Sequence, residues 1–373
     1  MSAALPHFAL TLMVNHACNL RCTYCYTGAK FSFRLPFETG QTAIQRAFRS
    51  LIPRGTLTLG FFGGEPLMEA PRILKWMTYA RQLARESDKR VNFALTTNGT
   101  VTHPQAWQVI VAEDLELAVS FDGSPSIHDR HRRDVHGKAT SATIQETIRR
   151  LLEAAKDFRV VTVVRPDNLA DLSNGIEFLH ALGVHAVDLS LDLWTSWSSR
   201  DAQSLQTLVA NLSKLWAQWL PHFSLSWFDA KLAELARLQK TTETVRCGFG
   251  DGEIAVAPSG RLYPCERLIG EDRPGNPLCL PGNALEGDDF LDSQTSNFTR
   301  CSPCSQCALA FACDTFCRCS NFIRTGDTNR PDGLLCLFNK AVATAVADVL
   351  DNRSPIPNSP SPVERPTKEN CYA

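Results

Sequence analysis

Fourteen cysteines are spread very unevenly along this chain of 373 residues. Three of them, Cys18, Cys22 and Cys25, lie within eight residues near the N-terminus, and ten more fall between Cys247 and Cys336. In a reducing compartment, cysteines at such short spacings are more often metal ligands than disulfide partners. Zinc and iron–sulfur clusters usually take four protein ligands. The first three cysteines therefore predict a metal site that lacks one protein ligand, which is typical of a reactive site.

The composition narrows the classes to which this chain can belong. Its formal net charge is −1, so no excess of charge favours binding to nucleic acid or to an anionic membrane surface. No uncharged apolar run approaches the ~20 residues that span a bilayer, and the N-terminal residues MSAALPHFAL lack the order of a signal peptide. We therefore expect a cytoplasmic protein with neither a nucleic-acid nor a membrane partner. A secreted disulfide framework is the alternative, and the missing signal peptide disfavours it.

Apolar segments of strand length alternate with segments of helical pattern through the first half of the chain. Helices are expected near residues 39–51, 70–85, 104–111, 204–238 and 335–350, and strands at residues 7–14, 57–64, 91–99, 115–123, 159–166 and 184–192. This alternation is typical of βαβ units around a parallel sheet. Six such units predict an α/β fold, a partial (β/α)6 barrel of the TIM type, whose chemistry sits at the C-terminal ends of the strands.

Changes in composition and in the length of the periodic segments divide the chain into three parts. A barrel with linking helices is expected over residues 1–243. After about residue 244 the chain changes to short segments, turns and cysteines, which predicts a small cysteine-rich domain and a final helix over residues 244–351. The Pro/Ser-rich residues 352–373 are expected to be a disordered tail.

Polar features follow four of the predicted strands at equivalent places. They are the segment from Cys18 to Cys25, the turn from Gly63 to Pro66, Asn98, and the segment from Ser120 to Gly123. Gly-rich turns also end strands for purely structural reasons. That reading does not account for Glu65 or for the cysteines, so we expect these features to form one site.

The spacing C-x3-C-x2-C, with Tyr24 before the third cysteine, resembles the signature of the radical S-adenosylmethionine superfamily. In that family three thiolates hold three irons of a 4Fe–4S cluster, and the fourth iron binds the methionine part of S-adenosylmethionine. Reduction by one electron then splits the cofactor and yields a 5′-deoxyadenosyl radical, which abstracts hydrogen from the substrate. A zinc site completed by His16 is the alternative.

The resemblance also implies which residues bind S-adenosylmethionine. The turn GGEP matches the second motif of the family, in which the acid meets the ammonium group of the methionine part. The implied cofactor-binding residues are Tyr24, Gly63, Gly64, Glu65, Pro66, Asn98 and Ser120, with Ser120 near the ribose.

The later cysteines resemble the SPASM extension of radical S-adenosylmethionine enzymes that modify peptides and proteins. Cys247, Gly260 and Cys265 precede the run Cys304-x2-Cys307-x5-Cys313-x3-Cys317, and Cys336 follows. The resemblance implies two auxiliary 4Fe–4S clusters. The inner one takes Cys247, Cys265 and Cys317, and the outer one takes Cys304, Cys307, Cys313 and Cys336. A fourth inner ligand is left open between Cys279, Cys301, Cys319 and a substrate, and structural zinc over residues 301–319 is the alternative.

These resemblances imply an enzyme that oxidatively modifies a ribosomally made peptide or protein, by a thioether, C–C or C–O crosslink or by dehydrogenation. Formylglycine formation of the sulfatase-maturing type is an alternative, and a non-catalytic iron–sulfur electron carrier is another. Glu266, next to Cys265, is the candidate catalytic base or else a glutamate in an exposed turn. We expect a reducing partner such as flavodoxin or ferredoxin, and a separate leader-peptide recognition protein or direct recognition. Residues 128–138 are expected to be a solvated loop, with binding of peptide carboxylates as the alternative.

Overall fold

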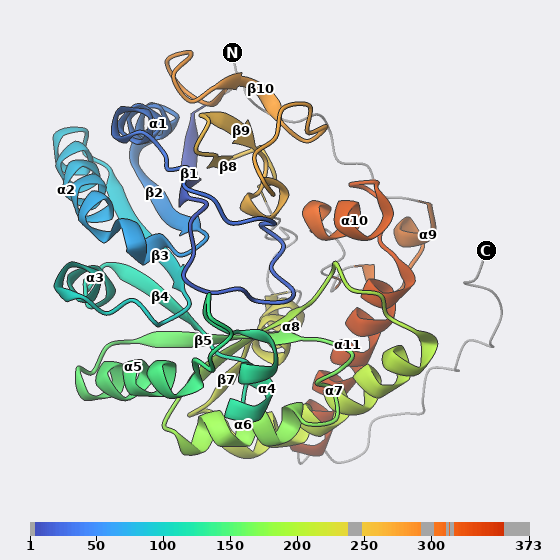
Figure 1. The fold of residues 1–373 in the computed structure, drawn as a ribbon. Helices are drawn as coiled ribbons and strands as arrows, with labels where there is room; N and C mark the ends of the chain where they lie inside the picture. Colours follow the sequence, from blue (N-terminus) through green and yellow to red (C-terminus); the bar gives the residue numbers. More distant parts are fainter. Residues whose placement is uncertain (1–3, 238–247, 292–301, 311–312, 314–316, 354–373) are drawn as a thin grey trace.

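Ten strands form a single sheet in the computed structural model of this chain, which describes residues 4–237, 248–291, 302–310, 313 and 317–353 (Figure 1). The order of the strands in the sheet is β10-β9-β8-β1-β2-β3-β4-β5-β6-β7. The middle of this order follows the chain, so consecutive strands lie side by side. That arrangement is what repeated right-handed βαβ units produce.

The parallel part of the sheet contains the six strands that the sequence predicts. They are β1 (Leu5–Asn15), β2 (Leu51–Gly63), β3 (Arg90–Thr97), β4 (Leu115–Ser120), β5 (Phe158–Val164) and β6 (Ala186–Leu191). Each pairs in parallel with the next. The α/β partial-barrel fold is therefore confirmed.

Helices cover the outer face of the curved sheet (Figure 1). They are α1 (Phe37–Arg49), α2 (Ala70–Glu86), α3 (Pro104–Ile110), α5 (Ser141–Glu153), α6 (Leu172–Ala181) and α7 (Ser199–Trp219). Two short helices lie just after the C-terminal ends of strands. They are η1 (Pro66–Glu69), which follows β2, and α4 (Pro125–His131), which follows β4. Alternate residues of the strands, such as Leu57 and Leu59 on β2, are buried against the helices. Burial of this continuous apolar face is the main stabilising contribution.

The cysteine-rich part of the chain extends the barrel sheet, which the sequence did not predict. Strand β8 (Glu253–Val256) pairs in parallel with β1, and β9 (Arg261–Tyr263) and β10 (Leu280–Asn283) continue antiparallel. At the other edge, β7 (Ser224–Leu225) pairs with β6. The domain boundary expected near residue 244 falls within residues 238–247, outside the described residues.

The helical region expected over residues 204–238 consists of two helices. Helix α7 begins at Ser199, where Ser198 and Asp201 form a reciprocal capping box, and it ends at Trp219, just before Pro221. Proline cannot donate a backbone hydrogen bond and ends a helix. Helix α8 (Ser226–Arg237) follows β7.

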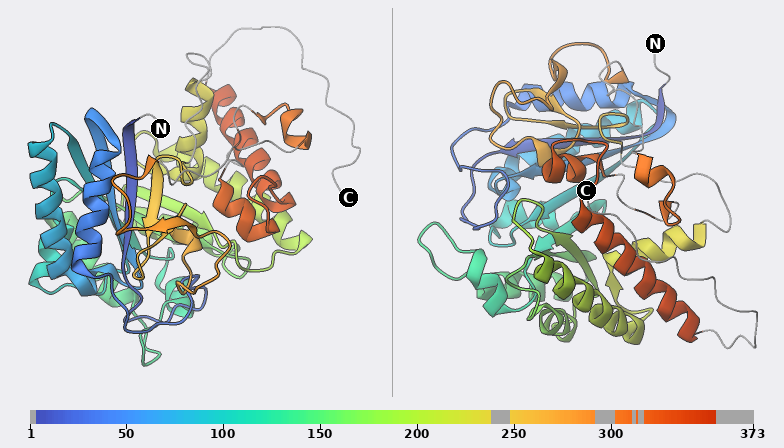
Figure 2. Two further views of the ribbon diagram at one scale, coloured as in Figure 1. Left: turned by 90° about the horizontal axis from the view of Figure 1, so that it is seen from above. Right: turned by 90° about the vertical axis from the view of Figure 1, so that its right-hand side faces the viewer.

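The C-terminal helices lie beside the barrel opening (Figures 1 and 2). They are η2 (Glu266–Leu268), α9 (Ser302–Ser305), α10 (Arg318–Thr325) and α11 (Gly333–Arg353). In length and composition α11 would suffice to cross a membrane over Gly333–Asp351. It packs against α7 and α8, with Val342 and Val346 buried, as does a core helix of a folded domain. The predicted tail falls largely on residues 354–373, outside the described residues.

Arg46 on α1 fastens the β10 region to the barrel. Its guanidinium donates to the backbone carbonyls of Asn283 at 2.6 Å and of Asp289 at 2.6 and 3.2 Å, and it lies 4.1 Å from the centre of the Phe290 ring. The Phe290 ring stacks on Phe8 of β1, 5.8 Å away. Because Arg46 is 4% exposed, solvent cannot replace these hydrogen bonds.

We predict that Arg46→Ala lowers the free energy of unfolding by about 2–4 kcal/mol, since buried carbonyls lose a charged donor. Urea denaturation measures this loss, and limited proteolysis should show faster cutting within residues 280–291. Arg49→Ala on the same helix is the control, because the Arg49 pair with Asp288 is exposed and worth little. Equal loss of stability in the two variants would contradict the role given to Arg46.

Candidate functional site

The three N-terminal cysteines lie on a long loop that leaves β1 and crosses the barrel opening (Figure 1). We call residues 16–36 the cysteine loop. Cys18, Cys22 and Cys25 are free thiols and partly buried. Burial raises the pKa of Cys18 to about 11 and also raises the pKa of Cys22. Burial acts in the same direction on Cys25, but Lys30, whose Nζ lies 3.0 Å from the Cys25 Sγ, outweighs it and lowers that pKa.

This donor set fits an iron–sulfur cluster. Buried thiols ionise only when a cation offsets the loss of solvation, and iron bound to sulfur supplies that charge. Three thiols on one loop, with Lys30 beside the third, provide three soft ligands of the kind that iron–sulfur clusters take.

The GGEP turn holds the cysteine loop in place through its backbone. The N–H of Gly64 donates to the carbonyl of Asn15 at 3.0 Å, and the N–H of Glu65 donates to the carbonyl of Ala17 at 2.9 Å. A Cβ at Gly63 would lie 2.6 Å from the Asn15 carbonyl oxygen, and one at Gly64 would lie 2.2 Å from that of Ala17. Only glycine permits so close an approach.

Glu65 is buried at the point where the ends of β2 and β3 meet. One carboxylate oxygen accepts from the N–H of Leu67 at 3.0 Å and from the hydroxyl of Thr97 at 2.8 Å, and the other accepts from the N–H of Asn98 at 2.8 Å. Burial raises the pKa of Glu65 to about 7, and these hydrogen bonds oppose the rise. A carboxylate offers about four acceptor positions, so one remains for a further donor.

Tyr24 is held by charged residues that the sequence analysis did not single out. Its hydroxyl donates to Asp122, which also accepts from the Arg132 Nε at 3.0 Å and from the N–H of Val163 at 3.1 Å. The guanidinium carbons of Arg132 and Arg165 each lie 5.3 Å from the centre of the Tyr24 ring. Burial alone would raise the pKa of Asp122, but Arg132 outweighs it and the pKa is lowered.

The expectation of a solvated loop at residues 128–138 is wrong for its first half. His128 is fully buried, with Nδ1 accepting from the N–H of Asp122 at 3.3 Å and Nε2 lying 3.0 Å from the Thr140 hydroxyl. Burial lowers the pKa of His128 to about 4, so it is neutral at physiological pH. The buried His131 contacts the Thr23 hydroxyl at 2.8 Å, whereas Arg130 and most residues from Arg133 onward are exposed. This segment therefore supports the cysteine loop.

The remaining predicted cofactor residues lie at the same edge of the sheet. The Asn98 amide donates to the Asn19 side chain at 2.9 Å and lies 3.8 Å from the Cys18 Sγ. Ser120 is buried at the end of β4, and Pro66 begins η1 behind Glu65. The ring of His16 stacks on Phe31 with centroids 4.4 Å apart, and neither of its nitrogens has a hydrogen-bond partner among the described residues.

A second group of thiols lies in the cysteine-rich part. Cys265 and Cys319 are buried in one apolar cluster, against which Cys317 packs. The Cys265 Sγ lies 3.6 Å from a carboxylate oxygen of Glu266, which is half-buried at the start of η2 rather than in an exposed turn. The sulfur of Cys265 and carboxylate oxygens of Glu253 and Glu266 lie within 4.8 Å of one another.

The four predicted outer ligands all lie in the described part of the chain. Cys304 lies on α9, Cys307 follows it, and Cys336 is near the start of α11. Cys313 is also described, and all four are half-buried. Cys247 and Cys301 lie outside the described residues.

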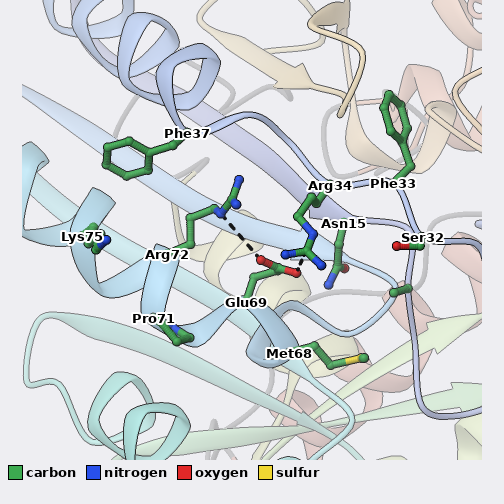
Figure 3. Close-up of a pocket in the computed structure, with 11 residues that line it drawn as sticks. Asn15, Ser32, Phe33, Arg34, Phe37, Met68, Glu69, Pro71, Arg72 and Lys75 are labelled. Atoms are coloured by element: carbon green, nitrogen blue, oxygen red, sulfur yellow. Dashed lines mark ion pairs between the residues drawn. The ribbon is translucent and has the colours of Figure 1, made fainter.

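A cavity of about 560 Å³ lies beside the cysteine loop, between residues 32–37 and the start of α2 (Figure 3). Glu69 is paired with Arg34 at 3.5 Å and with Arg72 at 3.6 Å. Since Lys75 also lines the cavity, cations outnumber carboxylates there. The lining therefore favours an anionic group.

We predict that Gly64→Ala disrupts the cysteine loop, because the new Cβ would overlap the Ala17 carbonyl. Iron bound after anaerobic reconstitution should fall by the content of one cluster, about four atoms per chain. Gly333→Ala is the control, because nothing lies within 4 Å of a Cβ there. Wild-type iron content in Gly64→Ala would contradict this role for the close approach.

Comparisons with known proteins show which proteins this chain resembles in sequence and in fold. Residues 12–179 match the radical SAM superfamily. The chain is 23% identical over 355 residues to the cysteine-type anaerobic sulfatase-maturating enzyme of Clostridium novyi, covering 87% of this chain and 91% of that protein. Its fold is similar to native anSMEcpe with bound AdoMet and Kp18Cys peptide, with a TM-score of 0.73, 19% identity, and coverage of 92% of this chain and 98% of that one.

The fold is also similar to Streptococcus suis SuiB bound to precursor peptide SuiA. The TM-score is 0.61 at 14% identity, covering 90% of this chain and 76% of that chain. The superfamily implies a 4Fe–4S cluster and S-adenosylmethionine, which the thiols of the cysteine loop fit. Residues 12–179 therefore form a radical SAM domain, and this chain is an enzyme.

Proposed function

We propose that this enzyme oxidatively modifies a ribosomally made peptide or protein, using the cluster of the cysteine loop and two auxiliary 4Fe–4S clusters. The observation that carries the proposal is the presence of two separate groups of thiols, a partly buried one on the cysteine loop and one around the buried Cys265. Tyr26, next to Cys25, stacks on Trp194 at 4.5 Å and on Phe62 at 6.1 Å. Burial raises the pKa of Tyr26, and Glu266 and Cys265 are among the charges that act on it, so Tyr26 lies between the two groups.

The chain's own residues have distinct roles in this proposal. Cys18, Cys22 and Cys25 hold the first cluster, which with S-adenosylmethionine supplies a radical able to abstract hydrogen. Glu65 receives the ammonium group of the cofactor at its remaining acceptor position. Tyr24 and Asn98 fix the cysteine loop through Asp122 and Asn19. Gly63, Pro66 and Ser120 shape the surrounding edge.

Peptide substrates are supported by what the similar proteins are named for. Sulfatase-maturating enzymes, a complex with Kp18Cys peptide and a complex with SuiA all concern peptide or protein substrates. Formylglycine formation and a thioether, C–C or C–O crosslink are both net oxidations, and both fit this site. In either case Glu266, beside Cys265, takes the substrate proton as the electron leaves toward an auxiliary cluster. A carrier without catalysis has no use for a GGEP turn.

Partners and location form part of the same proposal. One-electron reduction of the first cluster requires a donor such as flavodoxin or ferredoxin. A separate recognition protein, or direct contact with the barrel and the cysteine-rich part, binds the leader peptide. A reducing cytoplasm is the compartment that keeps so many thiols available for iron.

We predict that changing Cys18, Cys22 and Cys25 together to Ala abolishes 5′-deoxyadenosine formation. The iron content should fall from about twelve to about eight atoms per chain, since two auxiliary clusters remain. Chromatography of anaerobic reactions with S-adenosylmethionine and dithionite gives the first quantity, and colorimetric iron and zinc determination gives the second. Undiminished cleavage would overturn the radical chemistry, whereas zinc in place of iron would overturn only the auxiliary clusters.

The substrate class is tested with peptides encoded beside the gene and, separately, with a sulfatase-derived cysteine peptide. Mass spectrometry distinguishes loss of a hydrogen pair alone, expected for a crosslink, from loss of a hydrogen pair together with exchange of sulfur for oxygen, expected for formylglycine made from cysteine. Glu266→Gln should keep 5′-deoxyadenosine formation and lower product yield at least tenfold. Wild-type yield would remove Glu266 from the site.

We predict that S-adenosylmethionine binding weakens as the pH falls below about 7. The pKa of Glu65 is raised to about 7 by burial, and only the ionised carboxylate pairs with an ammonium group. The dissociation constant should therefore rise about tenfold per pH unit below that value. Isothermal titration of the reconstituted enzyme measures this trend. Glu65→Gln should bind roughly ten- to a thousand-fold more weakly and lose the pH dependence, and tight binding by this variant would exclude Glu65 as the partner.

A further inference from the structure

The cysteine-rich part contains one more buried thiol than its three proposed inner ligands require. Cys319 is 2% exposed, and its Sγ lies 3.3 Å from the Sγ of Cys317. The Cys319 side chain is also within hydrogen-bonding contact of Cys265. Three sulfurs contributed by two separate segments thus converge on one point, beneath the side chains of Phe249 and Leu268.

Local geometry explains why Cys319 and Cys317 point the same way. Cys317 is the N-cap of α10, with an extended backbone at φ −67° and ψ 96°, and Cys319 belongs to the first turn of the helix. The backbone changes from extended to helical directly after Cys317, and the two thiols lie together on the side that faces Cys265. Ser320 adds a hydrogen bond from its hydroxyl to the Cys317 Sγ at 3.1 Å.

Cys279, the other described candidate, faces elsewhere. It packs against a different apolar cluster, which includes Met13, Ala257 and Tyr263, and its thiol donates to the carbonyl of Leu280 at 3.6 Å. Arg267 places a positive charge beside Cys317 and Cys319, and their charges act on its pKa. A cation at this point suits a group of thiolates with a net negative charge. Cys301 lies outside the described residues.

We propose that Cys319 is a thiolate ligand of the inner auxiliary cluster, together with Cys265 and Cys317. This inference rests on the proposed function, because it assumes an auxiliary cluster at this site. It adds a third described thiolate beside Cys265 and Cys317. The iron that Cys319 binds is then closed to a substrate atom, so substrate deprotonation falls to a side chain such as Glu266.

The test is done in the background that lacks Cys18, Cys22 and Cys25, so that only auxiliary clusters contribute. Cys319→Ala is compared with Cys279→Ala after anaerobic reconstitution. Iron in Cys319→Ala should fall by up to half, from about eight to about four atoms per chain, or the electron paramagnetic resonance spectrum should show a three-iron cluster. Cys279→Ala should match its parent in both measurements. Parental iron and spectrum in Cys319→Ala would overturn the assignment.

Two further measurements distinguish failure of this inference from misfolding of a variant and from failure of the proposed function. Cys319→Ser keeps an oxygen ligand, so the cluster should persist with a shifted spectrum and reduction potential. An unchanged spectrum in that variant overturns the assignment even if Cys319→Ala fails to fold. If the parent itself holds no iron, the auxiliary clusters of the proposed function fail, whereas a loaded parent with unaffected Cys319 variants removes Cys319 alone.

Discussion

The Glu65 carboxylate accepts hydrogen bonds from groups at the ends of two strands, and the rest of the site depends on these hydrogen bonds. It joins the turn after β2 to Thr97 and Asn98 after β3, while the backbone N–H of Glu65 holds Ala17, next to Cys18. A buried carboxylate left without these donors would cost several kcal/mol. The position of the first cysteine is therefore set by the same residue that is proposed to receive the cofactor.

A second set of buried charges holds the middle of the cysteine loop. Asp122 and Arg132 form an ion pair in which both side chains are nearly inaccessible, with side-chain exposures of 1% and 8%. Such a pair adds little net stability compared with apolar residues, but breaking it leaves one charge unpaired in the interior. Its effect here is one of position, since Tyr24 and Thr23 are held by residues of this segment. The loop is thus fixed on both sides of Cys18 and Cys22 by groups that cannot relax into solvent.

The six parallel strands and the edge that carries the site could be predicted because apolar strands and helical periods are local signals. Strands β8 to β10 could not, since segments of three or four residues, such as Arg261–Tyr263, show no clear period. Cysteine spacing identified candidate ligands, but the direction of Cys319 depends on where α10 begins. The Asp122–Arg132 pair was missed because a single aspartate and arginine in loops carry no pattern. His128 was misread because a charged neighbourhood in sequence does not reveal burial.

Strand β1 pairs with one strand that is synthesised soon after it and with another that is synthesised much later. On one side it pairs with β2, and on the other Ala9 to Leu12 pair with Glu253 to Val256 of β8. Until β8 emerges from the ribosome, this edge of β1 exposes unpaired backbone groups, which is a template for aggregation. Closing so distant a contact is slow, because the loop entropy must be overcome first. The barrel sheet consequently gains the second partner of its first strand only after Glu253–Val256 of the cysteine-rich part has been made.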